Sequence, residues 1–140
     1  MATQARKTSV LILDDEPIVV RRLKPALEKM GYEVETFTSS AEALARVAER
    51  DFDIVITDLK MEGVDGMEFL TRVKERSPST EVIVITGFAT MATTRESFQK
   101  GVFDFLAKPF KITEIQEAVA RAEQKIKAAR AKEEIHHSAG

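Results

Sequence analysis

The sequence contains no cysteine. This absence excludes a disulfide framework, a thiolate zinc site and a cysteine nucleophile. Long apolar runs are also missing, because no stretch approaches the roughly 20 residues that a helix needs to cross a bilayer. Residues 1–8 lack the apolar region of a secretory signal peptide. We therefore expect a cytoplasmic protein that does not insert into a membrane.

A large excess of charge of one sign is missing as well. Lys and Arg together number 21 and Asp and Glu together number 23, which gives a net charge of −2. A chain so close to neutrality lacks the broad basic surface that binds a polyanion, so we expect no direct contact with nucleic acid. The 140 residues are 44% hydrophobic and 31% charged, which is typical of one soluble globular domain.

Five short segments have the composition of β-strands. Residues 9–14, 53–58 and 81–86 carry unbroken apolar runs, as expected for central parallel strands buried on both faces. Residues 33–37 and 102–107 alternate apolar and polar side chains, which predicts the two edges of the sheet. A segment with helical periodicity follows each strand. The alternation predicts a doubly wound α/β fold, a parallel five-stranded sheet with helices on both faces.

Most of the expected helices have recognisable ends. The start signals are Pro17 and the pairs Ser39/Glu42, Asp65/Glu68 and Thr113/Gln116. Gly31 and Gly101 stand where helices should end before a strand. Pro25 predicts a kink in the first helix, because it removes one backbone hydrogen bond. Residues 90–100 are rich in Thr and Ser, which predicts the weakest and most easily moved helix.

Polar side chains follow four of the five strands at the point where each strand ends: Asp14, Asp15, Glu16, Asp58, Thr86 and Lys108. Parallel α/β sheets bind ligands beyond the carboxyl ends of their strands, so these residues should share one rim. Any one of them alone could be a turn residue, a helix cap or a solvated charge. Carboxylates crowded together repel each other unless a cation intervenes. Hard oxygen ligands beside phosphate oxygens suit Mg²⁺, which is the cofactor we expect.

Missing motifs exclude other ligands for this rim. There is no GxGxxG and no GxxxxGK[ST], so dinucleotide and P-loop sites lack a phosphate cradle. The acidic residues 14–16 would repel a flavin phosphate and do not fit the DxD motif of haloacid-dehalogenase-like phosphotransferases. His136 and His137 lie in a polar tail and resemble neither a catalyst nor a ligand pair.

Five separated motifs resemble the receiver domain of two-component response regulators over residues 8–125: Asp14-Asp15, Asp58 with Met61 and Gly66, Thr86-Gly87, Phe105, and Lys108-Pro109-Phe110. Residues 101–110 are most similar to receivers of enhancer-binding transcriptional activators. The resemblance implies a flavodoxin-like fold with strand order 2-1-3-4-5, followed by a helical extension and polar tail over residues 126–140. Glu62 departs from the family, which usually has proline there.

The resemblance implies a signalling switch that catalyses only its own phosphorylation and dephosphorylation. Asp58 would accept a phosphoryl group from a sensor histidine kinase or a phosphotransfer protein. Asp14, Asp15, Asp58 and the backbone carbonyl of Lys60 would hold Mg²⁺. The ion and Lys108 would neutralise charge on the phosphoryl oxygens.

The switch itself is also implied by the resemblance. Thr86 would bond to a phosphate oxygen, and Phe105 would rotate toward the space that Thr86 leaves. The Lys108–Pro109 peptide bond would be cis. The surface formed by residues 90–100, 102–107 and the last helix would then change its contacts with an unknown downstream protein. Lys60 and Phe88 would overlook the phosphate and limit the access of water.

Two questions stay open at this point. A receiver-like scaffold that does not use phosphate is the alternative function, and an enzyme acting on a small phosphoester is a distant third. The last helix also carries a heptad-like seam that is longer than a receiver needs: Ile112, Ile115, Val119, Ala122, Ile126 and Ala129. Its far half is either a solvated tail or linker, or a helix that contacts a second copy or a partner protein.

Overall fold

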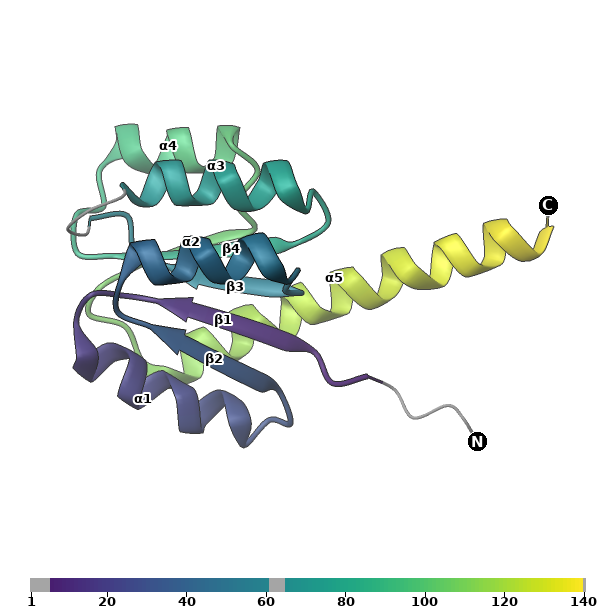
Figure 1. The fold of residues 1–140 in the computed structure, drawn as a ribbon, viewed down its shortest axis with the longest axis horizontal. Helices are drawn as coiled ribbons and strands as arrows, with labels where there is room; N and C mark the ends of the chain where they lie inside the picture. Colours follow the sequence, from purple (N-terminus) through teal and green to yellow (C-terminus); the bar gives the residue numbers. More distant parts are fainter. Residues whose placement is uncertain (1–5, 61–64, 140) are drawn as a thin grey trace.

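A computed structural model describes residues 6–60 and 65–139, with side chains through residue 134. A five-stranded parallel sheet lies between two layers of helices (Figure 1). The elements in chain order are β1 (Ser9–Leu13), α1 (Pro17–Glu28), β2 (Glu33–Phe37), α2 (Ser40–Glu49), β3 (Ile54–Thr57), α3 (Gly66–Arg76), β4 (Glu81–Thr86), α4 (Met91–Gln99), β5 (Asp104–Ala107) and α5 (Ile112–Ala139). The strand order β2-β1-β3-β4-β5 confirms the predicted topology and both predicted edges.

The sheet separates two hydrophobic cores because successive strand residues point to opposite faces. Val10 and Ile12 of β1 pack with α1 and α5, whereas Leu11 and Leu13 pack with α2 and α3. Every residue of β1, β3 and β4 is buried. The unbroken apolar runs therefore mark the strands that are covered on both faces.

Two predicted helix starts are confirmed in their side-chain contacts. The Ser39 hydroxyl accepts a hydrogen bond from the Glu42 N–H at the start of α2. The Asp65 carboxylate accepts from the Met67 N–H at the start of α3. Pro17 is the first residue of α1, as predicted. Side-chain caps of this kind each stabilise a helix by about 1 kcal/mol.

The predicted start of the last helix is wrong. The helix begins at Ile112, so Thr113 already lies inside its first turn. The Lys111 N–H donates to the Glu114 carboxylate at 2.7 Å, which provides the cap that was assigned to Thr113. Glutamate has the side-chain length to reach back from the third helical position to this N–H.

Gly31 and Gly101 end α1 and α4 with positive φ angles of 93° and 91°. This backbone conformation carries no steric cost for glycine and explains both predicted helix ends. Helix α1 continues through Pro25 to Glu28, and the kink at Pro25 stays a prediction. Within the described residues, no helix has both the length and the apolar character needed to cross a membrane.

Helix α5 extends well past the body of the domain (Figure 1). Ile115, Val119, Ala122 and Ile126 are buried against the sheet and α1, so most of the predicted seam belongs to the core of this chain. Ala129 and its neighbours through residue 134 are exposed. We call residues 127–139 the α5 arm. Homodimer formation through this helix stays a prediction.

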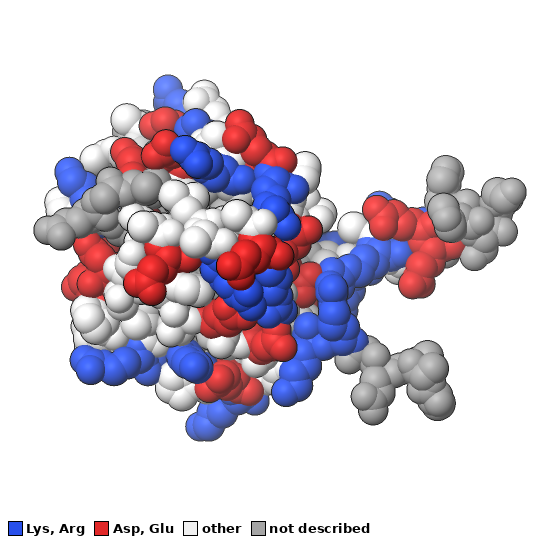
Figure 2. Space-filling view, in the orientation of Figure 1, with Lys and Arg blue, Asp and Glu red and all other residues white. Residues whose placement is uncertain are grey.

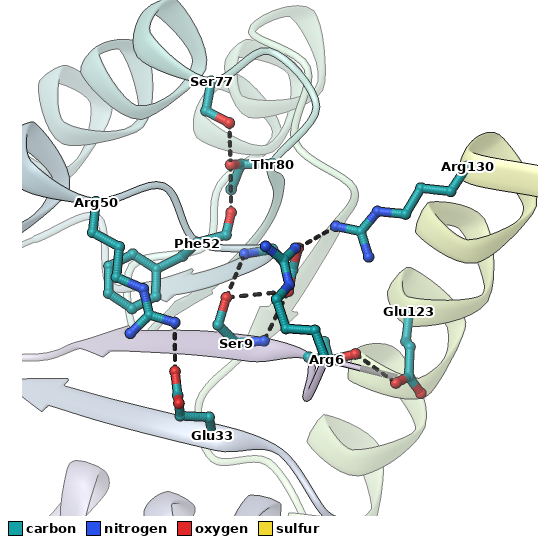
Figure 3. Close-up of polar contacts among 11 residues, drawn as sticks. Arg6, Ser9, Glu33, Arg50, Phe52, Ser77, Thr80, Glu123 and Arg130 are labelled. Atoms are coloured by element: carbon teal, nitrogen blue, oxygen red, sulfur yellow. Dashed lines mark hydrogen bonds and ion pairs between the residues drawn. The ribbon is translucent and has the colours of Figure 1, made fainter. Parts of the chain in front are cut away.

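The arm is anchored at the amino end of the sheet by Asp53, which directly precedes β3. Figure 3 shows Arg130 of α5 extending toward Arg6 and Ser9. The Asp53 Oδ1 atom lies 2.6 Å from Arg130 of α5 and 3.2 Å from Arg6. Its Oδ2 atom accepts hydrogen bonds from the backbone N–H and the hydroxyl of Ser9. A second ion pair joins Lys125 to Glu81 at 3.1 Å. Charged side chains thus hold the helix where its apolar contacts end.

A hollow of about 340 Å³ lies beside this anchor, between α5 and the loops that precede β3 and β4. Arg6, Lys125 and Arg130 line it together with Asp51 and other residues. Figure 2 shows Lys and Arg side chains gathered where the arm leaves the body. Acidic and basic groups both line the hollow, so it has no strong preference for charge of one sign.

The pKa of the Asp53 carboxyl lies below its ordinary value of 3.8. Burial raises this pKa, but the Ser9 N–H and the guanidinium groups of Arg130 and Arg6 outweigh burial. The ionised group therefore stabilises the fold at pH values above 3.8. That contribution is lost as the pH falls through the lower pKa of the folded state.

We predict that Asp53→Asn lowers the free energy of unfolding by about 1–3 kcal/mol at pH 7, because it removes two ion pairs and weakens the Ser9 contacts. Urea unfolding measures this change. The matched control is Asp51→Asn, which alters an exposed ion pair with Arg76 and should cost less than about 1 kcal/mol. The difference between wild type and Asp53→Asn should shrink below pH 3.8. Equal costs for the two variants contradict the anchoring role.

Candidate functional site

Two acidic residues meet where the strand order reverses, between β1 and β3. Asp14 directly follows β1, and its N–H donates to the Phe37 carbonyl of β2 at 3.1 Å. Asp58 directly follows β3, and its N–H donates to the Leu13 carbonyl of β1 at 3.1 Å. The parallel pairing thus continues one residue beyond the strands and fixes the backbone of both acids. Ligands of α/β sheets bind at this position.

Lys108 reaches the same place from the edge strand β5. Its N–H donates to the Thr86 carbonyl at 2.8 Å, and its peptide bond to Pro109 is cis, as expected. Its Nζ atom lies 2.8 Å from Asp14 Oδ2, 2.8 Å from Asp58 Oδ2 and 2.7 Å from Glu16 Oε1. Oxygens of these three carboxylates lie within 4.8 Å of one another.

The Asp14 carboxyl is fully buried, and burial raises its pKa above the ordinary value of 3.8. The Lys108 ammonium and the Glu16 N–H act in the opposite direction without cancelling burial. Within the described part of the chain, Asp14 Oδ2 receives no hydrogen bond, although the Lys108 ammonium lies 2.8 Å away as an ion-pair partner. A buried oxygen without a hydrogen bond is open to one more cationic or donor group. The donor set therefore fits a hard divalent cation such as Mg²⁺.

The charge of Lys108 is secured by its partners. Burial lowers the pKa of its ammonium group, but the contacts with Asp14, Asp58 and Glu16 outweigh burial and raise the pKa above its ordinary value. Lys108 is therefore cationic over the whole physiological pH range. It supplies one positive charge to a rim that carries three carboxyl groups.

The structure brings together three of the predicted site residues. Asp14, Asp58 and Lys108 are in contact, as predicted, whereas Asp15 is exposed and is not part of the three-carboxylate cluster. Glu16 is the third carboxylate of the cluster and contacts Lys108. The only indication of this role in the sequence is that Glu16 directly follows Asp14 and Asp15. Met61 and Glu62 lie outside the described residues.

Residues 10–120 match the family model of the response regulator receiver domain. The chain belongs to this family. It is 35% identical over 117 residues to the DNA-binding transcriptional regulator NtrC of Escherichia coli, which covers 84% of this chain and 24% of NtrC. The receiver thus spans about a quarter of the length of that relative.

Solved receiver structures have the same fold. A CheY-like receiver domain protein from Methanospirillum hungatei superposes with a TM-score of 0.85 at 25% identity, covering 89% of this chain and 99% of the other. A response regulator from Burkholderia pseudomallei, solved with a phosphorylated aspartic acid, calcium ion and citrate, gives a TM-score of 0.76 at 26% identity. That match covers 91% of this chain and 75% of the other.

The predicted switch residues, Thr86 and Phe105, both contact neighbouring parts of the chain. The buried Thr86 hydroxyl accepts a hydrogen bond from the Phe88 N–H at 3.1 Å. Phe105 is partly buried and packs against the core that contains α2 and α3.

The Asp58 Oδ1 atom accepts a hydrogen bond from the Lys60 N–H at 3.1 Å. The Lys60 ammonium lies 4.9 Å from the centre of the Phe88 ring, which is within cation–π range.

Gly66 lies very close to the backbone of Asp58 and Leu59. A Cβ atom at Gly66 would lie 2.3 Å from the Asp58 carbonyl oxygen and 2.4 Å from the Leu59 Cα atom. Real side chains do not tolerate such distances, and backbone atoms cannot turn aside as a flexible side chain can. Glycine at the start of α3 therefore allows the Asp58 segment to pass close to the helix.

We predict that Gly66→Ala lowers the free energy of unfolding by about 1–3 kcal/mol, because the added methyl group displaces the Asp58–Leu59 backbone. Urea unfolding provides the measurement. Gly87→Ala is the matched control, since a Cβ atom there meets nothing within 4 Å and should change stability by less than about 0.5 kcal/mol. Equal stability of Gly66→Ala and wild type would show that this close approach is relaxed in solution.

Proposed function

We propose that this receiver accepts a phosphoryl group on Asp58 from a sensor histidine kinase or a phosphotransfer protein. An Asp58 carboxylate oxygen forms a bond to the phosphorus of a phosphohistidine, the phosphorus–nitrogen bond breaks, and the imidazole leaves with its electron pair. The observation that carries the proposal is the Lys108 ammonium 2.8 Å from Asp58, beside an Asp14 oxygen that receives no hydrogen bond.

Mg²⁺ would be held by Asp14, Asp15, Asp58 and the backbone carbonyl of Lys60, and the closeness of Asp14 and Asp58 supports two of these ligands. The ion would supply positive charge for phosphoryl oxygens, which is the main demand of phosphoryl transfer. Lys108 contributes a second cation, already fixed by its contacts with the acids. The Burkholderia response regulator, solved with a phosphorylated aspartic acid and a calcium ion, supports this assignment.

Phosphorylation would act on Thr86 and Phe105. The Thr86 hydroxyl would exchange its contact with the Phe88 N–H for a phosphate oxygen, and Phe105 would turn inward. The contact surface for a downstream protein would be α4, β5 and α5. Met91 and Phe98 of α4 are 80% and 49% exposed, which supports a surface that buries apolar side chains on a partner.

The wider assignment follows from this switch. Residues 8–125 would be the signalling domain and residues 126–140 its helical extension, in the cytoplasm where the kinase donors act. The receiver would work through protein contacts and possess no catalytic activity beyond its own phosphorylation and dephosphorylation. A scaffold that ignores phosphate is less well supported, because it has no need for a crowded acidic rim that burial makes unfavourable.

We predict that incubation with acetyl phosphate and Mg²⁺ adds one phosphoryl group to the chain, measured by intact mass. Asp58→Asn should abolish the adduct because the amide is not a nucleophile for phosphorus. Asp51→Asn, an exposed aspartate near the opposite end of the sheet, is the control and should be phosphorylated like wild type. A wild-type chain that gains no adduct from acetyl phosphate or a phosphohistidine donor supports the scaffold.

We predict that Phe88→Ala speeds the loss of the phosphoryl group several-fold, because it opens the side of the site where Lys60 and Phe88 stack. Decay of the phosphorylated mass after removal of the donor measures the rate. Phe98→Ala removes an exposed aromatic ring from α4 without touching this contact and is the control. An unchanged rate in Phe88→Ala would remove Phe88 from the control of phosphate lifetime.

A further inference from the structure

Glu16 forms a contact that its place in the helix does not require. It is the N-cap residue of α1, yet its side chain makes no capping hydrogen bond. Glutamate is not among the side chains favoured at this position. Its carboxylate instead contacts Lys108, which is 92 residues away in the chain, at 2.7 Å.

The three carboxylates around Lys108 differ in their exposure to solvent. The side chains of Asp14 and Asp58 are 0% and 6% exposed, whereas the Glu16 side chain is 57% exposed. An exposed ion pair contributes little free energy, while a buried charge that loses its partner is costly. The contact with Glu16 is therefore the one that Lys108 can lose most easily.

Lys108 donates hydrogen bonds to Glu16 and Asp58, and Asp14 Oδ2 lies 2.8 Å from the same ammonium group. These three oxygens crowd the ammonium group, so a phosphoryl oxygen reaches Lys108 most easily when one of them moves away. Asp58 is itself the proposed phosphoryl acceptor, and Asp14 is buried beneath the site. Glu16 can turn into solvent without leaving a buried charge.

We propose that Glu16 is a positioning residue that occupies Lys108 in the resting state and is displaced by the incoming phosphoryl group. The inference rests on the proposed phosphorylation of Asp58. Glu16 keeps the ammonium directed toward the site, and it competes with the phosphoryl oxygens for the same donor. Phosphorylation replaces the Glu16–Lys108 contact, so Glu16 slows the reaction that Lys108 assists.

The decisive variant is Glu16→Gln, which keeps the size of the side chain and removes its charge. The rate of Asp58 phosphorylation by acetyl phosphate at saturating Mg²⁺ should rise about twofold to fivefold, the range set by the loss of an exposed ion pair. Glu28→Gln, at the far end of α1, changes the net charge equally and should leave the rate unchanged. A Glu16→Gln rate equal to or below that of wild type overturns the proposal.

The Lys108→Met variant shows whether Glu16 acts through Lys108. In Lys108→Met, the further change Glu16→Gln should not alter the residual phosphorylation rate, because the shared ammonium is gone. An acceleration that persists in this background overturns the proposal, since the charge of Glu16 would then act directly on the donor. A chain in which wild type also gains no phosphoryl group contradicts the proposed function itself, so the two failures are distinguishable.

Mg²⁺ titration of the unphosphorylated chain by calorimetry separates this role from that of a metal ligand. Removal of a group that supports a metal site lowers its affinity about tenfold or more. Glu16→Gln should weaken Mg²⁺ binding by less than this. A tenfold or greater loss overturns the proposal and assigns Glu16 to the metal site.

Discussion

The ammonium group of Lys108 joins parts of the chain that the backbone of the sheet leaves separate. It extends from the end of edge strand β5 across to the acids that follow β1 and β3. Without this cation, Asp14 would be a buried carboxylate beside a second carboxylate, with burial already raising its pKa. Removing one partner of a buried ion pair leaves the other uncompensated, which makes this contact costly to lose. The geometry of the acidic rim therefore depends on Lys108.

The two ends of β3 illustrate how similar groups serve different purposes. Asp53, at the amino end, has a pKa below its ordinary value because Ser9 and two arginines outweigh its burial. Asp14, beside the carboxyl end, has a raised pKa and one oxygen without a hydrogen bond. The satisfied carboxylate anchors the α5 arm to the body of the domain. The unsatisfied one gains most from a bound cation, which supports the proposal that the chemistry takes place at the carboxyl ends of the strands.

Much of the fold could be predicted because it depends on local patterns. Apolar runs identified the central strands, and the glycines at positions 31 and 101 identified helix ends, where the structure has positive φ angles. Predictions failed where a neighbouring residue could do the same task, as when Glu114, and not the predicted Thr113, capped α5. Thr90 and Thr93 were treated as poor helix formers, but they cap α4 reciprocally. Propensity describes the interior of a helix, whereas hydrogen bonds of side chains decide its ends.

By itself, the sequence determined which residues stand at the strand ends, because a strand break and the next polar residue are neighbours in the chain. Asp14, Asp58, Thr86 and Lys108 could be assigned to one rim for this reason. Only the tertiary structure decided that Glu16, rather than Asp15, reaches Lys108, and that Gly66 lies against the backbone of Asp58. It also decided that Arg130 meets Asp53 across 77 residues of chain. These contacts depend on the direction of side chains and on the path of distant segments, which the spacing of residues does not encode.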